Sequence, residues 1–436
     1  MTMSSFDIQK NVNPHFKNVW ESRVPYNVLK GGRNSFKSSV VALKLVKEMS
    51  KRMEKGKKAN VVVIRKVANT IRDSVFNKIQ WALNIYGYAN QFKATVSPFK
   101  ITHIYTGSSF YFYGADDFQK LKSNDISDIV AVWYEEAAEF DSKEEFDQTN
   151  ITFMRQKHKD VRFVKFYWSY NPPRNPYNWI NEWSEEVKTD DSYLVHESSY
   201  LNDELGFVTE QMLLDIERIK QNDYEYYRYI YLGEPVGLGS NVYNMSCFHL
   251  LTELPSNDRL IGISYALDTG HQQSATACGA YGITARGNVI LLDTYYYSPA
   301  GKTVKLAPSE LTVEIKRFID SVQDKYNANL IQLTIDSAEG ALRNQFFKDY
   351  GIRWHPVAKK KNQTMIDMVT SLLAQGRFFY LDNENNKIFI EEHKMYRYDE
   401  KTINTEEPRV VKEDDHTCDE FKYFVLDNAK LLGLKA

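Results

Sequence analysis

Short apolar runs recur along the first half of the chain, and segments with helical spacing separate them. The runs at 60–65 (NVVVIR), 129–134 (IVAVWY) and 161–167 (VRFVKFY) each lead into polar residues. A continuous apolar run is typical of a parallel strand that is buried on both faces and carries functional residues at its carboxyl end. The pattern therefore predicts an α/β fold with an open sheet in this half of the chain.

The pattern changes in the second half. Three strand-like runs with short turns at 260–270, 274–284 and 288–298 predict an antiparallel meander. A helix-like span at 308–326 and a strand at 330–337 follow, and the chain closes with a helix that carries acids. This order, β-β-β-α-β-α and onward to a final helix, is the plan of a ribonuclease-H-like domain.

Glycines and a proline cluster between the two patterns, at 233–239, which is typical of a linker. We therefore predict a first domain at 1–232, a linker at 233–257 and a second domain at 258–436. The length of 436 residues is sufficient for two separate cores.

Composition limits the class of protein. The hydrophobic and charged fractions of 43% and 26% are those of a soluble globular protein, and the net charge of -2 requires any DNA-binding surface to be a local patch. The three cysteines form no C-x-x-C pair, which argues against a zinc site or a disulfide framework. The first residues lack the apolar core of a signal peptide, and no run reaches membrane-spanning length, so we expect no membrane association.

The stretch 28–46 (VLKGGRNSFKSSVVALKLV) has the order of a phosphate-binding P-loop: strand, glycine-rich turn, Lys-Ser, helix. Backbone N–H groups of the turn and of the helix N-terminus would hold phosphate oxygens. Lys37 would reach the β/γ-phosphates, and the Ser38 hydroxyl would bind magnesium. Phe36 stands where the motif has its second glycine, and a Gly-Gly turn before an ordinary amphipathic helix is the alternative. The candidate ATP-binding residues are Gly31, Gly32, Arg33, Asn34, Ser35, Lys37, Ser38 and Glu135.

Two acids, Glu135 and Glu136, follow the second apolar run. In a P-loop ATPase one carboxylate at this place supports the magnesium, and the next positions the attacking water. We assign these roles to Glu135 and Glu136 respectively; the alternative is an acidic first helical turn that complements the helix dipole. Asn171 follows the third run, in WSYNPP, where its amide could sense hydrolysis and move a linked segment. An ordinary Asn-Pro turn is the alternative.

Three aspartates fit the plan of the second half. Asp268 ends the first strand, Asp336 ends the fourth, and Asp419 lies at the start of the last helix, with His416 three residues earlier on the same face. Two-metal phosphodiester cleavage needs carboxylates that converge from different elements. We predict that these three aspartates hold the metal ions, with Asp415 as a competing ligand; a capping role is the alternative for any one of them. Lys359, Lys360, Lys361 and Arg343 could hold a phosphate backbone or simply be solvated.

With these motifs the chain resembles the large terminase subunits of tailed bacteriophages, the ATPase-nucleases of DNA packaging. The resemblance rests on GGRNSFKS, in which Arg33 is a recurrent basic residue, and on VWYEEA, WSYNPP, LDTG, TIDS and DHTCDEFKY, in this order. It implies ATP-driven translocation of double-stranded DNA into a procapsid and cleavage of the concatemer by the C-terminal nuclease. The implied cofactors are ATP and Mg²⁺, with Mn²⁺ also supporting the nuclease.

The resemblance also implies partners and a place. The partners are double-stranded DNA, the small terminase subunit, the portal protein and further large subunits in a ring on the procapsid. The place is the host cytoplasm, with transient docking on the procapsid and absence from the mature virion.

Two other classes remain open. A helicase or repair ATPase with an accessory nuclease would need a second set of ATP motifs, and residues 259–436 show none. A non-enzymatic scaffold with degenerate versions of both folds would fit Phe36 and Glu135. The residues that the chemistry needs are all present, which argues against a non-enzymatic scaffold.

Overall fold

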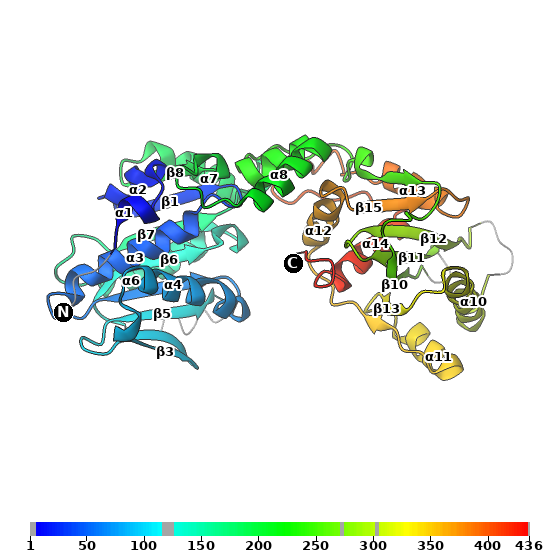
Figure 1. The fold of residues 1–436 in the computed structure, drawn as a ribbon, viewed down its shortest axis with the longest axis horizontal. Helices are drawn as coiled ribbons and strands as arrows, with labels where there is room; N and C mark the ends of the chain where they lie inside the picture. Colours follow the sequence, from blue (N-terminus) through cyan, green and yellow to red (C-terminus); the bar gives the residue numbers. More distant parts are fainter. Residues whose placement is uncertain (1–5, 116–125, 271–273, 301–304, 435–436) are drawn as a thin grey trace. The chain divides into compact units, whose positions relative to one another are not determined.

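The computed structural model describes residues 6–115, 126–270, 274–300 and 305–434. The chain divides into two compact units, Met1–Ile216 with Glu225–Gly237 and Glu217–Tyr224 with Leu238–Ala436. Figure 1 shows a sheet with covering helices in each unit. None of the helices in the described ranges is long and apolar enough to cross a membrane.

The first unit is built on an eight-stranded sheet in the order β3-β4-β5-β2-β6-β7-β1-β8. The strands from β5 to β8 in this order are parallel, and β3 and β4 add an antiparallel edge. The strand bounds are β1 (Tyr26–Gly31), β2 (Asn60–Arg65), β3 (Phe92–Val96), β4 (Phe99–His103), β5 (Ser109–Gly114), β6 (Ile129–Glu135), β7 (Lys165–Tyr170) and β8 (Tyr193–Ser198).

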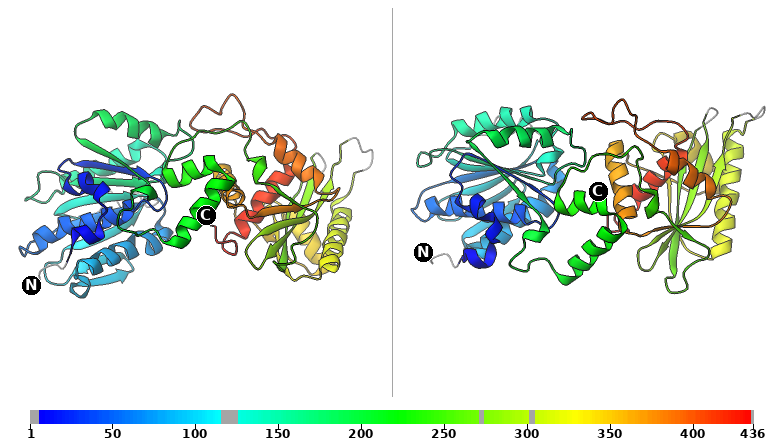
Figure 2. Two further views of the ribbon diagram at one scale, coloured as in Figure 1. Left: turned by 45° about the horizontal axis from the view of Figure 1, so that its top comes forward. Right: turned by 90° about the horizontal axis from the view of Figure 1, so that it is seen from above.

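Helices cover both faces of this sheet (Figure 2). Alternate residues of β2 face opposite sides, so that Val61 and Val63 join one core while Val62 and Ile64 join the other. This two-sided burial explains why the strands are apolar without interruption. The helices are α1 (Ile8–Asn11), α2 (Lys17–Glu21), α3 (Lys37–Met53), α4 (Asn77–Ile85), α6 (Lys143–Arg155) and α7 (Trp179–Glu186). The boundary between the two units falls within α8 (Glu210–Asn222), and α9 (Tyr224–Tyr227) follows it.

The third strand of the first half differs from its predicted bounds of 161–167. The strand begins at Lys165. The residues before it form a turn, in which the backbone N–H of Val161 donates to the carbonyl of His158. The apolar pattern alone does not separate this turn from the strand.

The second unit contains a seven-stranded sheet in the order β14-β13-β10-β11-β12-β15-β9. β10, β11 and β12 form the predicted antiparallel meander, and β13 pairs parallel with β10. The strands are β9 (His249–Leu251), β10 (Leu260–Asp268), β11 (Thr276–Thr284), β12 (Val289–Tyr297), β13 (Leu330–Ile335), β14 (His355–Pro356) and β15 (Phe378–Leu381).

Two groups of helices cover this second sheet. One core contains residues of α12, α13 and α14, and the other contains residues of α10 and α11. The helices are α10 (Pro308–Tyr326), α11 (Gly340–Tyr350), α12 (Asn362–Ala374), α13 (Lys387–Met395) and α14 (His416–Asp427). Because α14 packs against β10, β11 and β13, its first turn lies near the carboxyl ends of β10 and β13.

Part of the predicted linker belongs to the core of the second unit. β9 pairs with β15, and Tyr243, Cys247 and Phe248 are buried in the cluster formed with α12, α13 and α14. A segment with these contacts contributes to stability, whereas a free spacer does not.

We therefore predict that residues 238–436 fold alone and that residues 254–436 are much less stable. The shorter chain loses the buried side chains of Val242, Tyr243, Cys247 and Phe248, of which the larger are worth roughly 1.5–3 kcal/mol of burial each, together with the β9–β15 pairing. Thermal unfolding of the two fragments by circular dichroism measures the difference. Equal melting temperatures would show that the segment contributes nothing to the fold.

Candidate functional site

The ammonium group of Lys37 organises the first of two candidate sites. Its Nζ donates to the carbonyls of Gly31 and Gly32, to Ser35 Oγ and to Asn171 Oδ1, each at 2.9 Å. Burial lowers the pKa of Lys37 to about 8, although Glu136 and Glu135 act to raise it. Its four acceptors are uncharged, so the positive charge remains available to an anion at the N-terminus of α3.

The two glycines allow two other segments to approach the loop. A Cβ on Gly31 would lie 1.9 Å from the carbonyl oxygen of Ser198, and a Cβ on Gly32 would lie 1.9 Å from that of Tyr231. The backbone N–H of Gly32 donates to Ser198, and that of Arg33 donates to Ile230. These two amides therefore bind the protein in this structure, and their role as phosphate donors stays a prediction.

Phe36 adopts the backbone conformation for which the motif ordinarily has glycine. Its φ of 64° is left-handed, as is the φ of 60° at Asn34. This conformation costs a residue with a Cβ roughly 1–2 kcal/mol. The ring of Phe36 packs edge-on against Phe207 at 5.3 Å between centroids, which offsets part of that cost. The side chain therefore does not prevent the turn from forming.

The two acids of β6 lie close to the loop. Ser38 Oγ donates to Glu135 Oε1 at 3.4 Å, and Arg65 Nη1 lies 3.0 Å from Glu135 Oε2. Burial, helped by the charge of Glu136, raises the pKa of Glu135 to about 7, while Arg65 lowers it. Burial also raises the pKa of Glu136, against the pull of Lys37. The structure thus brings Lys37, Ser38, both acids and Asn171 to the carboxyl edge of the sheet, as predicted.

The second candidate site surrounds the hydroxyl of Tyr423 in α14. This hydroxyl donates to Asp336 Oδ2 at 3.4 Å. Burial raises the pKa of Tyr423, and the charges of Asp419, Asp268 and Asp336 raise it further. All three aspartates therefore lie within electrostatic reach of one group, although they come from β10, from the end of β13 and from α14.

Each aspartate is paired with a cation or with a histidine. His416 Nδ1 lies 3.0 Å from Asp268 Oδ2, and Lys359 Nζ lies 2.5 Å from Asp336 Oδ2. Burial raises the pKa of Asp268, and the hydrogen bond to Asp268 raises that of His416. His416 was expected on the face of Asp419, and the structure shows that its partner is Asp268.

Asp419 is bound by two lysines. Lys422 Nζ lies at 2.5 Å and Lys412 Nζ at 3.1 Å from its carboxylate. Burial alone would raise the pKa of Asp419, but the two lysines outweigh burial and lower it. Asp415, the competing ligand, accepts from Lys412 at 2.8 Å, so one lysine bridges both acids. The choice between Asp415 and Asp419 stays open.

Within the described ranges, no three His, Cys, Asp or Glu residues are grouped closely enough to hold a metal ion as they stand. The lysines explain this spacing, because ammonium groups neutralise the carboxylates that would otherwise share an ion. The donors are hard carboxylate oxygens, the ligands that Mg²⁺ and Mn²⁺ prefer. The residues therefore fit divalent ions once the lysines move aside.

The sequence analysis did not single out three residues of the second site. Lys422 and Tyr423 lie three and four positions after Asp419, and helical spacing was the signal that could have indicated them. Lys412 lies ahead of α14 in an irregular segment and gave no such signal.

Family comparisons match both halves of the chain. Residues 23–234 match the family model of the phage terminase large subunit, and residues 268–427 match that of the terminase RNase H-like domain. The large terminase subunit of Bacillus phage SPP1 is 32% identical over 245 residues, which cover 54% of this chain and 56% of that protein. The chain thus aligns with about half the length of this relative.

Two further proteins match over nearly their whole length. The PBSX phage terminase large subunit of Bacillus subtilis (strain 168) is 24% identical over 453 residues, 98% of this chain and 96% of that protein. The structure of the large terminase from a thermophilic bacteriophage superposes with a TM-score of 0.76 at 19% identity, covering 99% of this chain and 100% of that one. The matches confirm the predicted class, an α/β chain with an N-terminal ATPase sheet and a C-terminal ribonuclease-H-like domain.

The left-handed backbone at Phe36 yields a prediction. Phe36→Gly should keep nucleotide binding, because glycine adopts this conformation without steric cost. Phe36→Val should be about 1–2 kcal/mol less stable than Phe36→Gly and should weaken binding, because a residue with a branched Cβ is strained in this conformation. The measurement is the melting temperature with and without ATP.

A companion variant, Phe207→Leu, removes the ring contact and should lower the melting temperature with Phe at residue 36 but not with Gly there. Valine and glycine variants with the same melting temperature and the same ATP-dependent shift would contradict the strain argument.

Proposed function

Because the chain belongs to the family of phage terminase large subunits, we propose that its first unit hydrolyses ATP to translocate viral DNA and its second unit cuts that DNA with two metal ions. The observation that carries the proposal is the pair of charged sites, one in each unit. Lys37 lies within electrostatic reach of Glu135 and Glu136 at the edge of the first sheet. At the edge of the second, Tyr423 contacts Asp336, His416 contacts Asp268 and two lysines contact Asp419.

In the ATPase, the residues of the loop have separate tasks. The N-terminus of α3 and the Lys37 ammonium would bind the β- and γ-phosphates. Ser38 and Glu135 would hold Mg²⁺, which would neutralise charge on the phosphate oxygens. Glu136 would orient the attacking water, and its raised pKa favours acceptance of a proton. The large terminase of the thermophilic bacteriophage, which shares this fold, has been solved in complex with ADP.

The first test of the ATPase separates binding from hydrolysis. Glu136→Gln should lower the hydrolysis rate by about 10²-fold or more while ATP still binds, because it removes the proton acceptor and leaves the phosphate cradle intact. Lys37→Ala should lose both ATP binding and ATP hydrolysis. Phosphate release and ATP binding are measured on each variant, with Glu144→Gln, an exposed acid of α6, as the control. Hydrolysis at the native rate by Glu136→Gln would refute the assignment.

Asn171 has a geometry that suits a coupling residue. Its Oδ1 accepts a hydrogen bond from Lys37, the same ammonium that would bind the phosphates. Lys37 would contact both Asn171 and the γ-phosphate. Loss of the γ-phosphate after hydrolysis would therefore change the hydrogen bond between Lys37 and Asn171. The segment after Asn171 would then move with the state of the nucleotide.

Asn171→Ala should therefore reduce DNA packaging far more than it reduces ATP binding. The measurement compares packaged DNA per ATP hydrolysed with the dissociation constant for ATP. Packaging at the full rate by this variant would show that the Asn-Pro segment is only a turn.

In the nuclease, Asp268, Asp336 and Asp419 would hold the metal ions. When bound, these ions would activate a water molecule and stabilise the leaving oxygen of the phosphodiester. His416 would orient Asp268, and Tyr423 would orient Asp336 through their hydrogen bonds. Lys359 and Lys412, which are exposed, would release their carboxylates to the metal ions and remain available to DNA phosphates. Lys422 is buried and would keep its hydrogen bonds to Asn362 and Tyr396.

The nuclease proposal predicts that Asp336→Asn abolishes plasmid cleavage while ATP hydrolysis persists. Asp336 is the most damaging position because its strand lies next to that of Asp268 and because Asn at this position would lose a negatively charged metal ligand. His416→Ala should be milder, since a histidine that orients Asp268 does not replace a metal ligand. Plasmid linearisation is measured over a range of manganese concentrations and after chelation with EDTA, which should stop it.

Asp320→Asn is the matched control, because Asp320 forms an exposed pair with Lys316 on α10. Full cleavage by Asp336→Asn, or cleavage that survives EDTA, would overturn the two-metal assignment.

The same proposal extends to partners and organisation. The protein would act on double-stranded DNA in a ring of copies on the procapsid, with the portal protein and the small terminase subunit, in the host cytoplasm. The domains would be the ATPase at 1–232 and the nuclease at 258–436, with 233–257 between them. The buried residues just before β9, among them Tyr243, Cys247 and Phe248, support an earlier start of the second domain, near residue 238.

A further inference from the structure

A groove of about 740 Å³ lies at the amino-terminal edge of the sheet in the first unit. Its walls come from the start of β1, the end of α6, the segment leading into β7 and the start of β8. The P-loop lies at the opposite ends of the same strands. Because α/β proteins bind their substrates at the carboxyl ends of strands, this groove lies outside the catalytic site.

The groove is apolar inside and basic at its rim. Pro25, Tyr26, Val164 and Phe166 line it, and the side chains of Met154 and Phe163 add exposed apolar surface at 38% and 39% exposure. Exposed apolar surface inside a polar rim is typical of sites that bind other molecules.

Three cations stand on the rim: Arg23, Lys157 and Arg162. Asp191 is the one acid among the described residues that line the groove. Lys157 Nζ donates to a backbone carbonyl, that of Val161, and the Arg162 guanidinium lies 4.8 Å from the centre of the Phe163 ring. In the described part of the chain, no ion pair engages these three charges.

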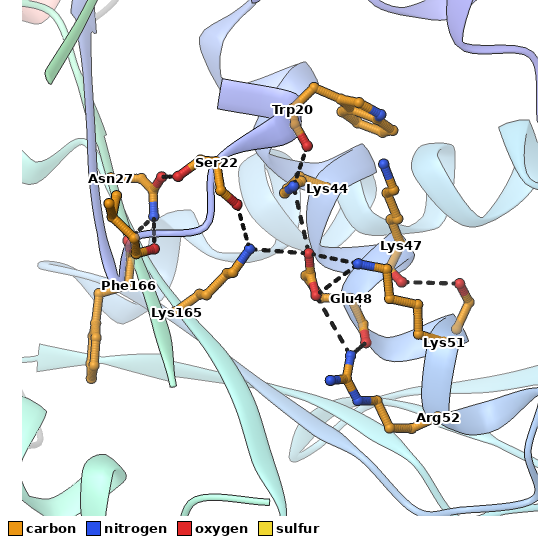
Figure 3. Close-up of polar contacts among 12 residues, drawn as sticks. Trp20, Ser22, Asn27, Lys44, Lys47, Glu48, Lys51, Arg52, Lys165 and Phe166 are labelled. Carbon is orange, nitrogen blue, oxygen red and sulfur yellow. Dashed lines mark hydrogen bonds and ion pairs between the residues drawn. The ribbon is translucent and has the colours of Figure 1, made fainter. Parts of the chain in front are cut away.

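One wall is held in place by partly buried hydrogen bonds, several of which Figure 3 shows. Lys165 Nζ donates to the carbonyl of Ser22 at 2.8 Å, and Ser22 Oγ donates to Asn27 Oδ1 at 2.6 Å. The backbone N–H of Phe166 donates to the carbonyl of Pro25 at 2.8 Å. The groove is thus formed in advance, which lowers the entropic cost of binding.

The same network adds positive charge to this edge of the sheet. The carboxylate of Glu48 lies within 4 Å of four cations, Lys44, Lys51, Arg52 and Lys165. Burial would raise the pKa of Glu48, but these cations lower it to about 2. Burial lowers the pKa of Lys44 to about 7 and also lowers that of Lys165, so Lys51 and Arg52 carry the surplus of positive charge that would attract a negatively charged partner.

We propose that this groove is a docking site for a partner protein, which inserts an apolar side chain flanked by acidic residues. Charge complementarity requires the acids, since the three cations of the rim form no ion pair with any described residue. The apolar floor requires the anchor, because burying phosphate or sugar against Phe166, Val164 and Pro25 would leave their polar groups unsatisfied. A nucleic acid therefore fits the groove less well than a peptide does.

The test uses an array of twelve-residue peptides that vary independently in acidic content and in a central Trp-Leu pair. The probe is the fluorescently labelled full-length protein. Wild type should prefer peptides with both features over neutral, basic or anchor-free ones. Arg23→Glu and Arg162→Glu should each weaken binding to them about tenfold, since each places a like charge against the peptide. Phe163→Ser should weaken binding while preserving the preference for acids.

Lys93→Glu is the matched control, because Lys93 is an exposed cation on β3, away from the groove. ATP hydrolysis by every variant reports correct folding, since none of these residues belongs to the catalytic machinery. The proposal fails if wild type shows no preference for acidic anchored peptides, or if Lys93→Glu weakens binding as much as the rim variants. It also fails if a DNA duplex displaces the peptides and loses affinity with the same variants, or if the rim variants instead disrupt self-association.

Discussion

The hydrogen bonds of the Lys37 ammonium are the interaction on which the first unit depends. They join the end of β1 to the start of α3 and, through Asn171, to the end of β7. A buried ammonium must find oxygen acceptors, because an unsatisfied buried charge would cost several kcal/mol. This requirement fixes the loop in a shape that leaves the N-terminus of α3 open to an anion. The same hydrogen bonds bring Asn171, the proposed coupling residue, next to Lys37, which we propose binds the phosphates.

In the second unit the buried charges that need partners are negative. Asp268, Asp336 and Asp419 are carried to one place by two strands and a helix, and their mutual repulsion must be balanced. Lysines and a histidine balance it in this structure. Such an arrangement is suited to divalent ions, because a metal can replace the ammonium groups without moving the backbone elements that carry the carboxylates. Both sites therefore contain a buried charge that a ligand of opposite charge can neutralise.

Several features follow from packing and not from the motif that marks the site. Phe36 is tolerated in a glycine position because the ring of Phe207 supports it. The two glycines of the loop are required by the close approach of Ser198 and Tyr231, which are distant in the sequence. A chain can thus depart from a motif at one residue while long-range contacts preserve the backbone path. The basic groove at the far edge of the sheet is also a product of packing, since its walls come from four separate segments.

The sequence by itself determined the class of fold, the order of the elements along each half of the chain and the identity of the charged residues. It could do so because burial on both faces makes strands apolar without interruption, and because Glu136, Asp268 and Asp336 stand at the ends of such runs. It did not determine that His416 pairs with Asp268, that Lys359 and Lys412 reach the aspartates, or that β9 joins the second core. Those pairings depend on which segments lie side by side after folding, and hydrophobic periodicity carries no information about side-chain partners that are far apart in the chain. Only the tertiary structure decided them.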